Sequence, residues 1–192
     1  MDGKKIGLLG LENCCLHLID PQESLMAQIH GRDRVVATIK LMLQFARIVK
    51  LPVIANTQYK KGLGPYVAEL ESMMGDIPRP DKVEFGALAN APTREFYASL
   101  PESVTTVILC GVESHICIYQ TAVGILAMGK TPWIVADAVS SRNVENHQLA
   151  LQRLRDLGAV IGPSEMIIYE LLGRAGTPNF KEVLPLIIGH SA

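Results

Sequence analysis

The chain has 192 residues, of which 48% are hydrophobic and 19% charged, and its formal net charge at neutral pH is −1. This balance provides for a buried core and excludes an intrinsically disordered chain. The near-zero charge argues against a surface built for nucleic acid or for an anionic membrane, so we expect a small-molecule partner. Because no linker-like stretch interrupts the chain, we expect one domain over residues 1–192.

The sequence contains neither a recognisable membrane span nor a targeting segment. No run approaches the roughly 18 apolar residues of a span, and Met1–Lys5 lacks the apolar core of a signal peptide. The four cysteines, Cys14, Cys15, Cys110 and Cys117, suggest no disulfide framework and have no zinc-binding spacing. We therefore expect an intracellular protein in a reducing compartment, with the cytoplasm as the first choice and mitochondrial association as an alternative.

Short apolar runs alternate with amphipathic segments along the chain. The runs predict six strands, at residues 14–19, 52–56, near 82–83, 104–110, 132–136 (ending at Asp137) and 159–161. Helical spacing predicts helices at 35–49, after Pro92, at 118–128, at 150–157 with Gly158 as the cap, at 165–172 and at 181–187. This alternation predicts a three-layer, doubly wound (Rossmann-like) α/β fold, in which helices cover both faces of a parallel six-stranded sheet.

Cys117 stands at the opening of the helix that follows the fourth strand. The polar turn 113–115 separates that strand from apolar residues at helical spacing, from Ile118 to Met128. Free N–H groups and the helix dipole stabilise a thiolate at a helix start, so we expect the pKa of Cys117 to fall below about 8.5. The alternative is that Cys117 is a small buried hydrophobic residue, as free cysteines often are.

Two further residues end strands on the same side of the predicted sheet. Ligands bind such sheets where the strand order reverses, which for the order 3-2-1-4-5-6 lies between the first and fourth strands. Asp20, Lys82 and Cys117 would then share one crevice. Asp20 would accept the thiol proton, and Lys82 would favour the charged forms of both groups. Considered alone, each residue has an alternative interpretation: Asp20 initiates a turn before proline, and Lys82 is a solvated surface cation.

Three motifs in order resemble the isochorismatase-like cysteine hydrolases, a family that also includes the nicotinamidases. The motifs are Leu18-Ile19-Asp20-Pro21-Gln22, Asp81-Lys82-Val83-Glu84-Phe85 and Cys110-Gly111-Val112-Glu113-Ser114-His115-Ile116-Cys117. The chain is most similar to the subgroup called isochorismatase domain-containing proteins, through the segments 58–65, 136–142 and 180–182. The resemblance covers nearly the whole chain.

The resemblance implies a catalytic triad of Asp20, Lys82 and Cys117 that forms a covalent cysteine intermediate. It also implies a cis peptide bond before Glu113, oxyanion donors at the backbone N–H groups of Glu113 and Cys117, and a homo-oligomer. We expect substrate contacts from Gln22, Gln58, Tyr59, Phe85 and His115. For His115 the alternative is a hydrogen bond that stabilises the loop, and for Tyr59 and Phe85 it is a place in the core.

Two departures from the family separate this chain from its best-known members. The loop 56–61 has no His or Asp where nicotinamidases hold a metal, so we expect no metal, no other cofactor and a substrate other than nicotinamide. Beyond Lys82, Gly86-Ala87-Leu88 replaces a common Ser-Ala-Phe, so the pocket wall differs. His17, within the first strand, is expected to be a core residue.

The sequence thus predicts a metal-independent cysteine hydrolase for a small amide, ester or vinyl-ether substrate. A second hypothesis is an oligomeric binding or scaffold protein that is catalytically silent. A third is a ribonuclease, since some parasite relatives of the subgroup have that label. The chain lacks the basic excess and the histidine pair that RNA binding and cleavage call for.

Overall fold

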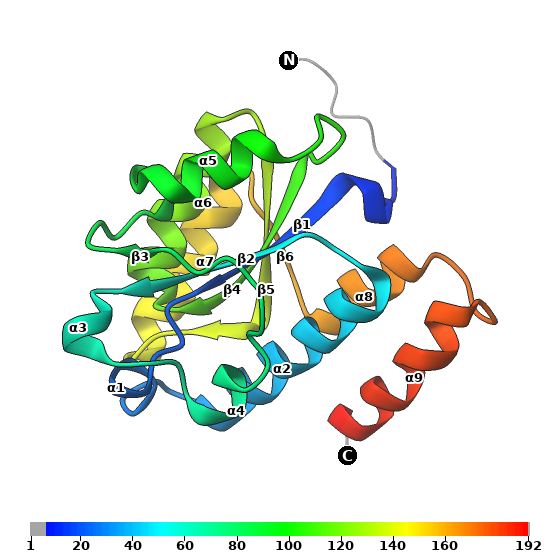
Figure 1. The fold of residues 1–192 in the computed structure, drawn as a ribbon, viewed down its shortest axis with the longest axis horizontal. Helices are drawn as coiled ribbons and strands as arrows, with labels where there is room; N and C mark the ends of the chain where they lie inside the picture. Colours follow the sequence, from blue (N-terminus) through cyan, green and yellow to red (C-terminus); the bar gives the residue numbers. More distant parts are fainter. Residues whose placement is uncertain (1–6, 192) are drawn as a thin grey trace.

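A computed structural model describes residues 7–191 of the chain, so Met1–Lys5 lie outside the described part. At its centre is a parallel sheet of six strands (Figure 1). The strands are β1 (Cys14–Ile19), β2 (Val53–Gln58), β3 (Asp81–Lys82), β4 (Thr106–Val112), β5 (Thr131–Ser140) and β6 (Val160–Gly162). Their order, β3-β2-β1-β4-β5-β6, confirms the predicted topology. The order reverses between β1 and β4, which brings the loops after these two strands together.

Helices cover both faces of the sheet, as predicted (Figure 1). One layer holds α2 (Arg32–Val49), α8 (Ser164–Leu172) and α9 (Pro178–Ser191), and the other holds α5 (Ala91–Ser99), α6 (Tyr119–Ala127) and α7 (Val144–Asp156). Short helical segments occupy the connections: η1 (Leu11–Asn13), α1 (Glu23–Met26), α3 (Lys60–Leu63), α4 (Ala68–Glu71), η2 (Ala87–Ala89) and η3 (Ser114–Ile118). Within residues 7–191, none of the helices has the length and hydropathy that crossing a membrane requires.

The strands are continuously apolar because each face of the sheet has its own core. Along β1, Leu16 and Leu18 pack with the α2 layer, whereas Cys15 and Ile19 pack with the α6 layer. All four side chains are almost completely buried. Burial of a leucine or isoleucine side chain stabilises the folded state by about 1.5–3 kcal/mol relative to exposure. The sheet is therefore a stable support for the loops at its edge.

The largest differences from the predicted boundaries lie in β5, α7 and α9, and the other predicted boundaries shift by at most three residues. Strand β5 continues to Ser140 instead of ending at Asp137, and its register against β4 shifts between Leu109 and Gly111. This irregularity leaves the Asp137 carboxylate free to accept hydrogen bonds from the Ser164 N–H and hydroxyl at the start of α8, at 2.8 and 2.7 Å. Helix α7 begins six residues earlier than expected, because the Asn143 side chain caps a polar first turn. Helix α9 extends beyond 181–187 at both ends.

Candidate active site

Asp20, Lys82 and Cys117 meet at the carboxyl edge of the sheet. Asp20 follows β1, Lys82 ends β3, and Cys117 lies in η3 directly after β4. Lys82 Nζ is 2.6 Å from Asp20 Oδ2, and the Cys117 thiol interacts with the same carboxylate. The chain thus brings together three side chains separated by 35 to 97 positions in sequence, as the strand order predicts.

The backbone fixes Asp20 in an unusual conformation, with φ at 53°. Its N–H donates to Asn56 O at 3.1 Å, which ties the end of β1 to β2. Burial raises the pKa of the carboxyl group to about 6, while the Lys82 ammonium and the Cys117 thiol act in the opposite direction. Within residues 7–191, no donor makes a hydrogen bond of standard geometry to Oδ1. Asp20 is therefore mostly ionised at pH 7 and has one oxygen available to accept a proton.

Lys82 is held between two oxygen atoms in the interior. Its side chain has no exposed area, and Nζ donates to Asp20 Oδ2 and to Gln58 Oε1, both at 2.6 Å. The Gln58 amide is oriented by its Nε2, which donates to Val83 O at 3.0 Å. A buried ammonium in this position favours the carboxylate form of Asp20 by direct attraction.

Cys117 occupies a sharp turn between β4 and α6. The turn is built on Gly111, with φ at 119°, and on a cis peptide bond between Val112 and Glu113. A Cβ atom at Gly111 would lie 1.9 Å from Ile19 O, so only glycine allows β4 to lie this close to β1. The Cys117 side chain is thereby directed toward the pocket, and the residue is 6% exposed.

The expected low pKa of Cys117 is wrong for this environment. Burial and the neighbouring Asp20 carboxylate raise the pKa of the thiol to about 12, and the opposing effects of Lys82 and of the Glu113 backbone N–H are smaller. Burial also raises the pKa of Cys14 and Cys15 to about 12, and it raises the pKa of Cys110 well above its ordinary value. An available carboxylate and access to the pocket distinguish Cys117 from the other three.

The turn that carries Cys117 is tied to the segment 141–147 by three consecutive side chains. Glu113 Oε2 accepts from the N–H and the Nε of Arg142, at 2.9 and 3.1 Å. Ser114 Oγ pairs with His147 Nδ1, and His115 Nδ1 pairs with Ser141 Oγ, each at 2.9 Å. These contacts hold the Glu113 N–H against the Cys117 sulfur, where it lowers the pKa of the thiol. A donor in this position can also stabilise an oxyanion.

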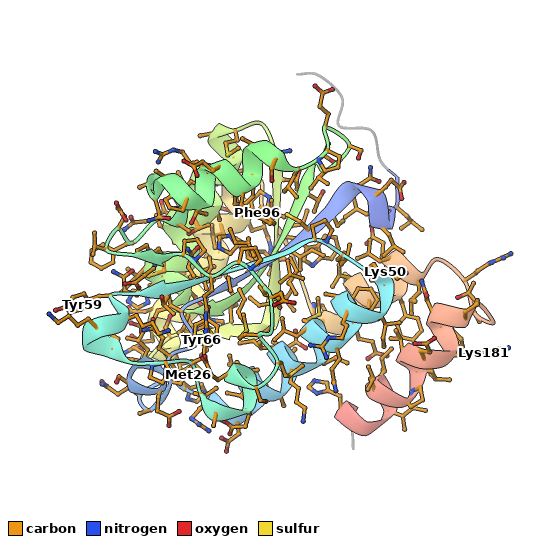
Figure 2. The ribbon with its side chains drawn as sticks, in the orientation of Figure 1. Met26, Lys50, Tyr59, Tyr66, Phe96 and Lys181 are labelled. Atoms are coloured by element: carbon orange, nitrogen blue, oxygen red, sulfur yellow. The ribbon has the colours of Figure 1, made fainter. Side chains whose placement is uncertain are left out.

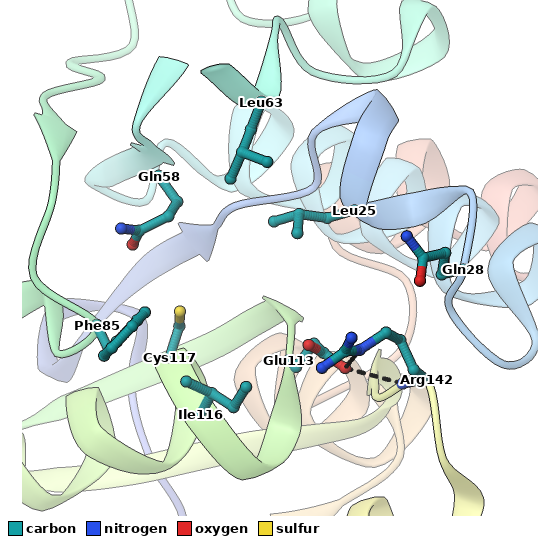
Figure 3. A pocket seen from close by; sticks show the side chains of 9 residues that line it. All are labelled: Leu25, Gln28, Gln58, Leu63, Phe85, Glu113, Ile116, Cys117 and Arg142. Carbon is teal, nitrogen blue, oxygen red and sulfur yellow. Dashed lines mark hydrogen bonds and ion pairs between the residues drawn. The ribbon is translucent and has the colours of Figure 1, made fainter. Parts of the chain in front are cut away.

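A pocket of about 210 Å³ opens beside the Cys117 sulfur (Figure 3). Its lining residues are Leu25, Gln28, Gln58, Leu63, Phe85, Glu113, Ile116, Cys117 and Arg142. Sequence reasoning named four of these, Gln58, Phe85, Glu113 and Cys117, as site residues. The other five either lie a few residues after β1 or belong to the segments that carry the family resemblance. This proximity is the signal that could have identified them.

Three expected substrate contacts lie outside this lining. Gln22 is fully buried, and its amide accepts from Gln58 N and donates to Gln58 O and Gly64 O, so it holds the loop after β2. Tyr59 is 51% exposed and lies at the outer edge of the molecule beside α3 (Figure 2), where a Cβ atom on Gly62 would be 2.2 Å from its ring. His115 pairs with Ser141, which is the stabilising alternative given above.

No group of three or more His, Cys, Asp or Glu side chains within residues 7–191 is arranged to hold a metal ion. Asn56, at the start of the loop compared with nicotinamidases, is buried, and its Oδ1 pairs with His17 Nε2 at 2.7 Å. His17 Nδ1 pairs with the Tyr97 hydroxyl at 2.8 Å. Burial lowers the pKa of His17 to about 4, so it is a neutral core histidine, as expected.

Comparison with known proteins identifies the same family as the motifs. The isochorismatase domain model matches residues 14–166. Isochorismatase domain-containing protein 2 of Xenopus laevis is 37% identical over 96% of this chain and 88% of its own length.

Among solved structures, the MAR1 ribonuclease from Caenorhabditis elegans superposes with a TM-score of 0.88. It is 33% identical and covers 95% of this chain and 93% of its own. The YcaC protein of Escherichia coli, described as an octameric hydrolase of unknown specificity, has a TM-score of 0.89 at 20% identity, over 98% and 95% of the two chains. Because the family model matches most of this chain, the chain belongs to the isochorismatase domain family.

Proposed function

We propose that this protein is a cysteine hydrolase that cleaves a small amide or ester through Asp20, Lys82 and Cys117, without a metal or other cofactor. The observation that carries the proposal is the contact of a buried thiol with a carboxylate that has a free oxygen and an ammonium partner. Membership of the isochorismatase domain family supports hydrolysis in general terms.

The first half of the reaction forms a thioester. Asp20 Oδ1 takes the proton from Cys117 Sγ as the sulfur attacks the substrate carbonyl carbon, and the π electrons of the carbonyl move to its oxygen. The backbone N–H groups of Glu113 and Cys117 stabilise this oxyanion. When the carbonyl re-forms, the bond to the leaving group breaks, and Asp20 returns the proton to it. The products are the acyl-thioester and free ammonia, amine or alcohol.

The second half restores the enzyme by the same proton path. Asp20 takes a proton from a water molecule, whose oxygen attacks the thioester carbon. Collapse of the second tetrahedral intermediate breaks the carbon–sulfur bond, and Asp20 passes the proton to the departing sulfur. The Lys82 ammonium limits the rise in the pKa of Asp20, so that the carboxylate remains a base near neutral pH.

A substrate panel tests the proposal directly. Short-chain amides and esters would be incubated with the wild-type protein and with Cys117→Ala, and released ammonia or alcohol would be measured. We expect turnover that Cys117→Ala abolishes, and a mass increase on the Cys117 peptide that hydroxylamine removes. Hydrolysis that persists in Cys117→Ala would contradict the mechanism. A broad panel without any turnover would favour a binding or scaffold role.

Ribonuclease activity is the second candidate, because the C. elegans neighbour has that name. The net charge of −1 and the fixed partners of His17 and His115 weigh against it. Incubation with single-stranded and structured RNA, with Cys117→Ala as the control, distinguishes the two activities. We expect both proteins to leave the RNA intact, and cleavage that depends on Cys117 would reverse the preference.

We also propose that the protein forms a homo-oligomer. Val83 and Phe85 follow the edge strand β3 near the pocket and are 69% and 55% exposed, which is unusual for large apolar side chains. The octameric E. coli YcaC structure supports the proposal. Size-exclusion chromatography with light scattering should give a multiple of 20.9 kDa, and Val83→Asp should reduce it. A monomeric wild-type protein would contradict this assembly.

A further inference from the structure

The pocket beside Cys117 has a polar group at each end and apolar walls between them (Figure 3). One end holds the Cys117 sulfur and the Gln58 amide, where the proposed reaction takes place. At the other end lie the Gln28 amide and the Arg142 guanidinium, which is paired with the Glu113 carboxylate. The walls are Leu25, Leu63, Phe85 and Ile116. A ligand that fills this space therefore has a polar group at both ends of a short apolar body.

Among residues 7–191, Arg142 is the only cationic residue that lines this pocket. Its main-chain N–H and its Nε donate to Glu113 Oε2, and this pairing fixes the orientation of the guanidinium. Neither Nη atom forms a hydrogen bond with any group in residues 7–191, and the side chain is 55% exposed. The planar Nη edge, with four N–H donors, matches the two oxygens of a carboxylate.

Gln28 adds a second unused polar group at this end. Its backbone N–H is bonded to Leu25 O within the chain, but its side-chain amide has no hydrogen-bond partner among the described residues. Two sets of free donors thus lie at the end of the pocket where Glu113 is already paired with Arg142, and the walls between the two ends are apolar. A volume of about 210 Å³ restricts the ligand to a few carbon atoms, below the range of about 300–1,000 Å³ for drug-sized ligands.

We propose that Arg142, assisted by Gln28, binds a carboxylate of the substrate at the end of the pocket away from the scissile bond. The substrate class is then a short-chain dicarboxylic acid with one carboxyl group as an amide or ester and the other free. This inference rests on the proposed hydrolase function, whose substrate it narrows. The competing interpretation is that Arg142 only positions Glu113. In that case, replacing Arg142 would change the affinity for charged and for neutral ligands equally.

Paired ligands that differ only in charge distinguish the two interpretations. Succinamate and glutaramate would be compared with succinamide and glutaramide by titration calorimetry, using Cys117→Ala so that no ligand is consumed. We expect at least one monoamide to bind about tenfold more tightly than its diamide. Adding Arg142→Gln should remove this preference by weakening monoamide binding much more than diamide binding, whereas Arg142→Lys should keep part of it. Arg153→Gln, on the exposed surface of α7, is the charge-matched control and should keep all of it.

Several outcomes would overturn the carboxylate site. The first two are equal affinity for monoamide and diamide, and a charge preference that survives Arg142→Gln. The others are a loss of affinity in Arg142→Gln that is equal for both ligands, and the absence of monoamide binding. Ammonia release from the same ligands by the wild-type protein tests the hydrolase proposal separately. Charge-selective binding without turnover would support the carboxylate site and contradict the hydrolase. Turnover without charge preference would support the hydrolase and contradict the site.

Discussion

Replacing Asp20 by asparagine should change how the reactivity of Cys117 depends on pH. A thiol with a pKa of about 12 is ionised in only about one molecule in 10⁵ at pH 7, so its reaction needs a base. Asp20 supplies that base once its carboxyl group is ionised, above a pKa of about 6. In the wild-type protein, the rate of alkylation at Cys117 should therefore rise to pH 6 and then stay nearly constant to pH 9.

The size of the effect follows from the two titrations. Below pH 6 the wild-type rate should fall tenfold for each pH unit, because protonated Asp20 is too weak a base to take the thiol proton. In Asp20→Asn the inflection near pH 6 should disappear. Between pH 7 and 9 the rate should then rise about tenfold for each pH unit, as ionisation of the thiol itself becomes the source of thiolate. The slope of log rate against pH over this range is thus about zero in one protein and about one in the other.

Iodoacetamide labelling followed by peptide mass mapping measures this rate at each cysteine. Cys14, Cys15 and Cys110 have no exposed area or almost none and serve as unreactive internal controls. Asp156→Asn, an exposed position in α7, controls for the loss of one negative charge and should behave like the wild type. A wild-type profile that climbs steadily from pH 7 to 9, without an inflection near pH 6, would refute the role of Asp20 as the base.

Three further changes test the stability of the structure by urea unfolding. Lys82→Met removes the cation that keeps Asp20 ionised, so folding at pH 7.5 must either bury an unpaired carboxylate or take up a proton, and the change should cost about 3–5 kcal/mol. The loss should be smaller at pH 5, where protonation of Asp20 is easier, and an equal loss at both values would contradict the pairing. Gly111→Ala drives a Cβ atom into the Ile19 carbonyl and should cost about 3 kcal/mol or more, so a stable, active alanine variant would contradict the close approach. The pKa of His17 falls from 6.5 for a solvated histidine to about 4 in the folded state, so the unfolded state binds more protons between these values. Wild-type stability should then drop by about 3 kcal/mol from pH 7 to pH 4 at this group, and His17→Gln should lose that part of the pH dependence.

The parallel topology was predictable because the chain repeats one simple pattern. Fully buried strands such as β1 and β4 read as continuous apolar runs, and the helices between them show one apolar face. Boundaries were less predictable where polar side chains decide them. Strand β5 continues past Asp137, whose carboxylate accepts hydrogen bonds from Ser164, 27 positions away, and no local pattern reveals this pairing.

The members of the candidate triad were predictable for a related reason. Asp20 and Lys82 stand where strands end and Cys117 follows directly, so the strand order alone brings them close together. The pocket lining was not predictable in the same way, because the direction of a side chain in a loop depends on backbone angles. Tyr59, with φ at 39°, lies outside the pocket, whereas Phe85 in the next loop lines it.

The protonation state of Cys117 depends on which of two opposing effects is larger. A helix start stabilises a negative charge by about 0.3–1 kcal/mol, and by about 2 kcal/mol in favourable geometries. The rise of the thiol pKa from 9.0 in water to about 12 corresponds to about 4 kcal/mol in the other direction. Burial and the Asp20 charge therefore outweigh the helix, and the resting sulfur is a neutral thiol. A neutral thiol reacts slowly with oxidants and alkylating agents, so the site restricts thiolate formation to the moment when Asp20 takes the proton. The same argument explains why Lys82 is buried beside Asp20: without a cation, burial would raise the pKa of the carboxyl group further above 6, and the base would be lost at neutral pH.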